Sequence, residues 1–394
     1  MLVATCVVTD RAKKKWVKEV SKMLREGTQV FLTGCGAFER GRAMDYDAFF
    51  EVYPELEKFR ENLVLLGEDP EQYDEHLNVA DYELNREFYE WAPHKKTKFL
   101  GKSWAKKSYT TRKYIVIQSG CDTFCSFCLT IRKRGAHRNR NLADILAEID
   151  DFVAGGGQEI ILTGVNLAAR GASHTRKPEE SRFSELLEAI VEKTAVPRIR
   201  ISSLGPEFLD AKFFALMKNP RFLPHFHFSI QSFSTPVLAG MNRNYDEKVL
   251  DEVLRKIRAV ERPDADKISI GADIIVGFPS ETEEEFQKTF AALEKYGVTK
   301  LHAFPFSAHQ KGETVPAAAL ENQVEQGVKK ARERALIAEG ERVRENWLAQ
   351  QRGKKFQVLL ESAREGVWTG WTENYISVEV AGDFARGQVV EVEL

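Results

Sequence analysis

The sequence predicts an α/β protein in which an open, barrel-like parallel sheet lies between a smaller α/β domain and a small antiparallel β-barrel. From residue 114 onward, short apolar runs alternate with amphipathic helical patterns, as in a parallel sheet covered by helices. Before residue 92 the chain shows a shorter series of the same kind. After residue 353 the pattern becomes strict alternation with glycines at the turns, which predicts an antiparallel barrel.

Composition limits the class of protein. A chain of 394 residues, 43% of them hydrophobic, has room for about two or three domains with cores. We expect a cytoplasmic protein with no membrane partner, because Met1 does not open a signal peptide and no apolar run reaches transmembrane length. The odd number of five cysteines favours metal binding in a reducing compartment over a disulfide framework.

The N-terminal domain is predicted to place two cysteines at one edge of its sheet. Its strands are expected at 2–6, 29–33 and 62–67, with a helix at 10–25. The first two strands end at Cys6 and Cys35. Because parallel strands end at the same edge of a sheet, both thiols should face one crevice. Two buried structural cysteines would explain these two residues equally well.

The central part is predicted to hold six strand and helix units, fewer than the eight of a closed barrel. Strands are expected at 114–117, 159–162, 198–202, 225–229, 268–276 and 300–304, and helices at 142–153, 184–193, 246–260 and 283–296. Small or polar residues follow the strands, among them Gly164, Ser203 and Gln231. Together they are candidates to bind the polar groups of a cofactor, although turn chemistry explains each of them singly.

The C-terminal part is predicted to begin with a charged helical stretch over 317–352. Four strands follow, at 356–361, 367–371, 375–380 and 389–394. Trp368, Trp371 and Tyr375 could stack on unpaired bases. Aromatic residues in so small a barrel more often belong to its core.

Charge is laid out in blocks, although the net charge is only -2. Fifteen acidic residues lie in 45–90, eight Lys or Arg in 95–113, seven in 11–25 and five in 132–140. The run in 11–25 could equally be a solvated helix face. Basic runs beside a metal site would instead attract a polyanion to it.

Three cysteines form the strongest motif of the chain. Cys121, Cys125 and Cys128 have the spacing Cys-x3-Cys-x2-Cys, which suits three irons of a 4Fe-4S cluster and leaves the fourth iron open for chemistry. Zinc is the competing metal, but a structural zinc site needs four ligands. The nearest further candidate is His137, nine residues beyond Cys128.

This motif and several other blocks resemble those of a known family. With Phe127 directly before Cys128, the motif resembles the radical S-adenosylmethionine (SAM) signature. The order of a cysteine-bearing N-terminal domain, this core and a C-terminal barrel is similar to that of the methylthiotransferases, whose barrel is called the TRAM domain. The blocks IQSGC, LTGVN, ISSLGPE, HFHFSIQS, MNRNY, DIIVGFPSET and TENY also resemble the family. ISSLGPE and LHAFPFS resemble most the branch acting on N6-threonylcarbamoyladenosine beside the tRNA anticodon (t6A37).

The resemblance implies a fold and its division into domains. We expect a partial flavodoxin-like N-terminal domain at 1–92 and a basic linker at 93–113. An open (βα)6 partial TIM barrel, the radical SAM core, follows at 114–318. A helical connector at 319–352 and a TRAM-like domain at 353–394 complete the chain.

The resemblance also implies the reaction. One SAM molecule yields a radical that removes hydrogen from C2 of the adenine, and a second gives a methyl group to sulfur held at an auxiliary 4Fe-4S cluster. The implied partners are the tRNA anticodon stem-loop, an electron donor such as flavodoxin or ferredoxin, and a sulfur source. Cys121, Cys125 and Cys128 would hold the radical cluster, and Phe127, Gly164, Ser203 and Gln231 would contact SAM.

The N-terminal cysteines depart from the family pattern. The family holds the auxiliary cluster with three cysteines, whereas this chain offers Cys6 and Cys35. We expect the third on a unit upstream of Met1, so that the N-terminus looks truncated; an absent cluster or an unusual ligand is the alternative. Other functions left open are action on isopentenyladenosine tRNA or a ribosomal protein, a radical SAM enzyme without sulfur insertion, and a non-catalytic RNA-binding protein with a structural metal.

Overall fold

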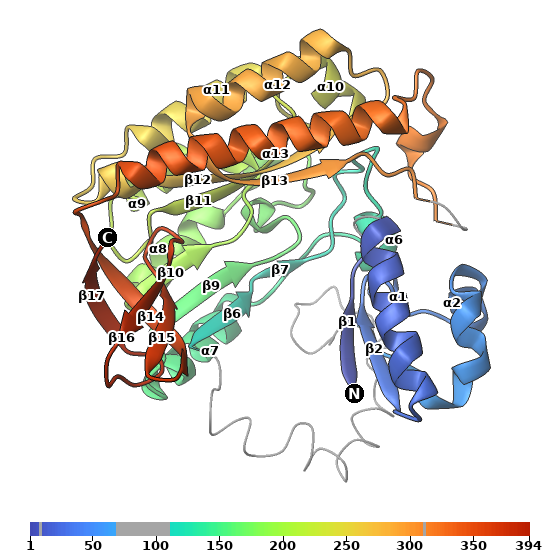
Figure 1. The fold of residues 1–394 in the computed structure, drawn as a ribbon, viewed down its shortest axis with the longest axis horizontal. Coiled ribbons are helices and arrows are strands. Elements are labelled where there is room, and N and C mark those ends of the chain that lie inside the picture. Colours follow the sequence, from blue (N-terminus) through green and yellow to red (C-terminus); the bar gives the residue numbers. More distant parts are fainter. Residues whose placement is uncertain (8–9, 68–110, 310–312) are drawn as a thin grey trace.

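The computed structural model describes residues 1–7, 10–67, 111–309 and 313–394 (Figure 1). Its elements form an N-terminal sheet, a central open barrel and a C-terminal sheet. The predicted boundary at 92, the acidic stretch 68–90 and most of the basic linker at 93–113 lie outside the described residues.

The N-terminal sheet has the strand order β1-β2-β5, and its strands are parallel. Buried residues of α1, including Trp16, Val20 and Leu24, pack on it. Asp45 caps α2 because its carboxylate accepts the backbone amides of Asp47 and Ala48. The elements are β1 (Leu2–Thr5), α1 (Asp10–Arg25), β2 (Val30–Gly34), β3 (Phe38–Glu39), β4 (Arg42–Ala43), α2 (Tyr46–Val52) and β5 (Leu63–Leu65). The predicted helix and three strands are confirmed.

The central barrel consists of six parallel strands that follow one another in chain order. The strands are β6 (Arg112–Val116), β9 (Glu159–Thr163), β10 (Arg198–Ile201), β11 (His225–Gln231), β12 (Ser269–Val276) and β13 (Val298–Pro305). They pair as β10-β9-β6 and β11-β12-β13, and a parallel bridge between Leu204 and Phe228 joins the two halves. The predicted open parallel sheet is therefore confirmed.

Helices cover the outside of this sheet (Figure 1). Their apolar faces form one continuous core with the strands, for example through Ile145, Leu187 and Leu254. The helices are α7 (Leu142–Ala154), α8 (Phe183–Lys193), α9 (Ala211–Leu216), α10 (Thr235–Gly240), α11 (Glu247–Arg258) and α12 (Glu283–Tyr296). No helix in the described part of the chain is long and apolar enough to cross a membrane.

The C-terminal part consists of one long helix and a curled antiparallel sheet. The helix α13 (Gln326–Ala349) lies along β13 and α12. It is shorter than the predicted stretch 317–352, because a short 3-10 turn at Pro316–Ala319 and a loop come first. The sheet has the order β16-β15-β14-β17. Its strands are β14 (Lys355–Arg364), β15 (Val367–Trp371), β16 (Ser377–Ala381) and β17 (Val389–Glu393).

Residues 372–375, in the loop between β15 and β16, close the barrel at the N-terminal ends of its strands. Arg200 donates to the carbonyl oxygens of Thr372 (2.8 Å) and Glu373 (2.9 Å). The Tyr375 ring lies 4.0 Å from the Arg200 guanidinium and 4.7 Å from the His225 ring. Tyr375 therefore belongs to the interface between barrel and sheet, which agrees with the structural alternative and not with stacking on a base.

A buried ion-pair network lies directly behind this loop. Glu159 is fully buried and accepts from Arg198 (2.9 Å) and Arg200 (2.7 Å). Burial alone would raise the pKa of Glu159, but the charges and hydrogen bonds of the two arginines outweigh it and lower that pKa. Arg112 pairs with Glu361 of β14 at 2.7 Å, so that barrel and sheet share one charged interface.

We predict that Glu159→Gln lowers the free energy of unfolding by about 3 kcal/mol, because it leaves two buried guanidinium groups without their carboxylate. Denaturation monitored by circular dichroism measures this loss. The matched control is Glu261→Gln, whose carboxylate pairs with Lys218 on the surface; it should change stability by no more than about 0.5 kcal/mol. Equal losses for the two variants would contradict a structural role of the buried network.

Candidate functional site

The three-cysteine motif lies on a loop closed at its base by a short hairpin. The loop runs from β7 (Gln118–Ser119) to α6 (Thr130–Arg134), and β7 pairs with β8 (Arg138–Asn139). Gly120 has a φ of 67°, and a Cβ there would lie 1.8 Å from the Ala136 carbonyl oxygen. Only glycine fits this close approach.

Polar groups surround the three sulfurs. The Cys121 thiol donates to Thr123 Oγ1 (3.3 Å), and the Cys128 thiol to Thr130 Oγ1 (2.9 Å). Arg243 Nη1 lies 3.2 Å from the Cys125 Sγ and donates to it. Each sulfur therefore has a fixed neighbour.

Burial controls the protonation of these groups. It raises the pKa of Cys121, and that of Cys128 to about 12, so metal binding would have to displace the protons. Burial opposes the charge of Arg243, but Tyr245, Cys125 and Glu207 outweigh it and hold the pKa of Arg243 well above its ordinary value. A permanent cation therefore faces the Cys125 sulfur.

Gln118 ties the cysteine loop to the loop after β9. Its Oε1 accepts the backbone amides of Val165 (3.0 Å) and Asn166 (2.9 Å), and its Nε2 donates to the carbonyl oxygens of Ser119 and Gly120. A Cβ at Gly164 would lie 2.9 Å from the Gln118 carbonyl oxygen. The glycine that the sequence assigns to the cofactor is thus also required for this contact.

A second brace comes from the loop before α8. Thr175 is fully buried and donates to the Asp122 carboxylate through both its amide and its hydroxyl. Thr123 donates to Thr175 Oγ1 at 2.8 Å. These residues, like Arg243, were not singled out from the sequence. Arg243 lies in the MNRNY block, whose resemblance to the family could have pointed to it. Thr175 lies in no such block.

A cavity of about 320 Å³ connects the cysteine loop, the N-terminal domain and the C-terminal ends of β11 to β13. Cys128 and Phe127 line it on one side, Cys35 on another, and Gln231 and Asp273 on the barrel side. Gln231 adopts a φ of 69° where β11 shifts its register against β12. One cysteine of the N-terminal pair, Cys35, and one of the three-cysteine motif, Cys128, therefore line the same cavity.

The other predicted site residues lie at the border of this cavity or outside it. Cys6 is exposed and follows Thr5, which is paired with Gly34 in the sheet. Cys6 thus lies near Cys35 in the sheet, but Val7 and not Cys6 lines the cavity. Ser203 is half-buried in the loop after β10 and does not line this cavity either.

Buried contacts hold the N-terminal domain against the cysteine loop. Glu313 receives the ammonium groups of Lys13 on α1 (2.5 Å) and of Lys133 on α6. Lys133 and Arg132 also accept, through their carbonyl oxygens, the amides of Gly41 and Arg40. Arg134 Nε donates to the Cys35 Sγ at 3.3 Å. The position of Cys35 relative to Cys128 is therefore fixed by the fold.

The donor set fits an iron–sulfur cluster better than a single zinc ion. In the described residues, the three cysteines do not form a group close enough to hold one metal ion; His227, Asp273 and His302 do. Cluster ligands bind three different irons and need no such closeness. His137, the candidate fourth zinc ligand, has its Nδ1 2.8 Å from Gln118 Nε2.

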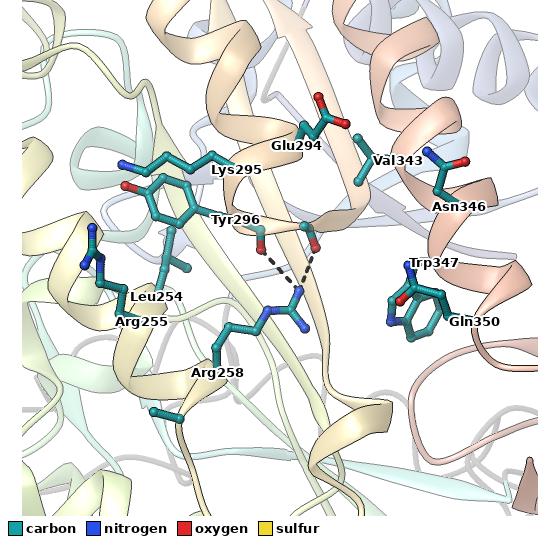
Figure 2. Close-up of a pocket in the computed structure, with 12 residues that line it drawn as sticks. Leu254, Arg255, Arg258, Glu294, Lys295, Tyr296, Val343, Asn346, Trp347 and Gln350 are labelled. Carbon is teal, nitrogen blue, oxygen red and sulfur yellow. Dashed lines mark hydrogen bonds between the residues drawn. The ribbon is translucent and has the colours of Figure 1, made fainter.

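A larger cavity, of about 800 Å³, lies between α11, α12 and α13 on the outer face (Figure 2). Arg258, its most central cation, donates to the carbonyl oxygens of Tyr296 (3.2 Å) and Gly297 (2.9 Å). None of the residues identified from the sequence as site residues lines this cavity.

Comparison with known proteins shows the family to which this chain is similar. The Radical SAM superfamily matches residues 115–293. The threonylcarbamoyladenosine tRNA methylthiotransferase MtaB of Thermotoga maritima is 32% identical over 97% of this chain and 83% of its own length. That of Rickettsia prowazekii is 29% identical over 99% of this chain and 86% of its own length.

Two further matches are more distant or shorter. The tRNA-2-methylthio-N(6)-dimethylallyladenosine synthase of Oceanobacillus iheyensis is 34% identical, over 72% of this chain and 54% of its own length. The radical SAM methyltransferase TsrM of Kitasatospora setae, solved with tryptophan and a SAM analogue, shares the fold with a TM-score of 0.50 and 14% identity, over 83% of this chain and 74% of its own. The chain belongs to the radical SAM methylthiotransferase family.

Proposed function

We propose that this protein attaches a methylthio group to C2 of N6-threonylcarbamoyladenosine beside the anticodon of tRNA. The observation that carries the proposal is the single cavity lined by both Cys128 of the cysteine loop and Cys35 of the N-terminal domain. A reaction that joins sulfur to a carbon radical needs the radical cluster and the auxiliary cluster to face the same substrate. The relatives that match nearly the whole chain are named for this substrate.

The cysteine loop holds the radical cluster in this proposal. Cys121, Cys125 and Cys128 would each bind one iron, and Arg243 would remain beside Cys125 as a positive charge. A bound 4Fe-4S cluster and SAM would supply the radical chemistry needed to break an inert C–H bond. Cys6 and Cys35 contribute ligands for the auxiliary cluster.

The remaining residues of the site position SAM and keep water out. Gln231 offers polar atoms on the barrel side of the cavity, and Phe127 lines the side of the cysteine loop. Gly164 and Ser203 lie on the neighbouring loops after β9 and β10. Ile275 and Phe306 complete an apolar lining, which would limit the reaction of a radical with solvent.

Exposed basic residues of α6 and α1 would bind the tRNA backbone. Arg132 is half-exposed on α6, directly after the cysteine loop. Lys14, Lys18 and Lys22 are exposed on α1. We propose the anticodon stem-loop as the bound RNA element, with flavodoxin or ferredoxin as electron donor and a separate sulfur source. Phosphate contacts of this kind make binding strongly dependent on salt.

We predict that Cys125→Ser abolishes 2-methylthio-t6A. The variant and the wild type would be expressed in a bacterial strain that lacks its own t6A methylthiotransferase, and tRNA nucleosides would be measured by mass spectrometry. The expected fall is at least hundredfold, because the cluster loses a ligand. Ser126→Ala in the same loop is the control and should retain the modification. Unchanged tRNA nucleosides with wild-type protein would contradict the proposed substrate.

We also predict about eight irons per chain after anaerobic reconstitution, with Cys6, Cys35 and a third ligand holding the auxiliary cluster, falling to about four in Cys35→Ser, because each 4Fe-4S cluster contributes four. Iron and acid-labile sulfide analyses measure this directly. About four irons in the wild type, unchanged in Cys35→Ser, would contradict the auxiliary role of Cys35 and leave the radical site intact.

A further inference from the structure

Three titratable side chains meet at mid-depth in the barrel, below the cysteine loop. His227 Nε2 and His302 Nδ1 each lie 3.0 Å from Asp273 Oδ1, and the two imidazole rings are 5.0 Å apart. Asp273 also lines the cavity that contains Cys128. The reaction proposed above gives these residues no role.

The hydrogen bonds of Asp273 fix the orientation of His302. Burial alone would raise the pKa of Asp273, but hydrogen bonds and charges from the two imidazoles lower it to about 2. Because the ionised carboxylate only accepts, the nitrogens that face it must carry hydrogen. His302 is therefore held through Nδ1 and has Nε2 left for another partner. Its side chain is 46% exposed, whereas that of His227 is 10% exposed.

Lys300 adds a positive charge without a carboxylate partner. It lies two residues before His302 on β13, so both side chains point to the same face of the sheet. Its ammonium lies 4.2 Å from the Tyr375 ring and 5.9 Å from the Trp371 ring, and no carboxylate in the described residues pairs with it. Burial and the charges of Arg200, Arg344 and Arg112 lower its pKa, which marks an excess of positive charge.

This part of the barrel suits an anion better than a cation. The ligand atoms of His227, Asp273 and His302 lie within 4.8 Å of one another, a spacing that a metal ion could use. A bound cation, however, would displace both hydrogens from Asp273 and would stand near the unpaired Lys300. Burial, Arg200, His227 and Lys300 also hold the pKa of His225 well below its ordinary value, as expected beside excess positive charge.

We propose that Lys300 and His302 bind the carboxylate of the threonylcarbamoyl group on the substrate adenine, with Asp273 and His227 orienting His302. In this complex His302 is the imidazolium, so that Nδ1 donates to Asp273 and Nε2 donates to the substrate carboxylate. The inference rests on the proposed function and specifies how its substrate is selected. In adenine, the carbon that carries this substituent and the reacting C2 flank the same ring nitrogen, so the substituent stays near the cavity. A dimethylallyl group has no charge and would leave the half-buried Lys300 without a carboxylate partner, which costs free energy.

Two anticodon stem-loop RNAs test the proposal, one with t6A and one in which the threonyl carboxylate is replaced by a carboxamide. Binding to the reconstituted protein would be measured by fluorescence anisotropy, which does not require turnover. The wild type should prefer the carboxylate by about tenfold or more, the size expected of hydrogen bonds to a charged group. Lys300→Met and His302→Gln should each reduce this preference to less than about threefold, while their affinity for the carboxamide RNA stays within twofold of wild type.

Lys330→Met, an exposed lysine on α13, is the matched control and should keep the wild-type preference. Iron content and melting temperature establish that each variant is folded. Equal binding of the two RNAs by the wild type would overturn the inference, as would a Lys300→Met variant that weakens both RNAs alike, since that would indicate contact with phosphate. If the proposed function is wrong, the result is different. The wild type would then still prefer the carboxylate RNA in binding, but it would form no methylthio product on t6A.

Discussion

The buried carboxylate of Glu159 is the interaction on which the arrangement of barrel and C-terminal sheet depends. It neutralises Arg198 and Arg200 inside the barrel, and Arg200 in turn holds the carbonyl oxygens of residues 372 and 373. One anion thus allows a cluster of cations to be buried where the strands begin. Lys300 has no carboxylate partner among the described residues, so it adds to the positive charge of the barrel interior.

The opposite end of the barrel is organised by a second buried carboxylate, Glu313. By receiving Lys13 and Lys133, it joins the first helix of the chain to the helix that follows the cysteine loop. The cavity between Cys35 and Cys128 therefore has walls from three parts of the sequence. A substrate bound there touches the N-terminal domain and the barrel at once, which suits chemistry that combines a sulfur atom with a carbon radical.

Periodicity predicted the elements well because it is a local property. The six barrel strands, the helix at 10–25 and the strand at 367–371 were all found where the pattern placed them. The strand predicted from 375 begins instead at Ser377, because Tyr375 has a φ of 66° and turns towards Arg200. Contacts such as Arg243 with Cys125, or Thr175 with Asp122, join distant segments, so no local pattern could reveal them. The cysteine motif could be interpreted as a candidate cluster site from sequence alone, because three thiolates at this spacing suit three irons of a 4Fe-4S cluster.

The contact between the C-terminal sheet and the barrel has a consequence for how the site is supported. Residues 372–375 plug the end of the barrel at which the strands begin, and Tyr375 covers Arg200 there. None of these residues lines the cavity beside the cysteine loop. The C-terminal sheet therefore holds the barrel strands from the end opposite to that cavity, and it supports the site without contributing a side chain to it.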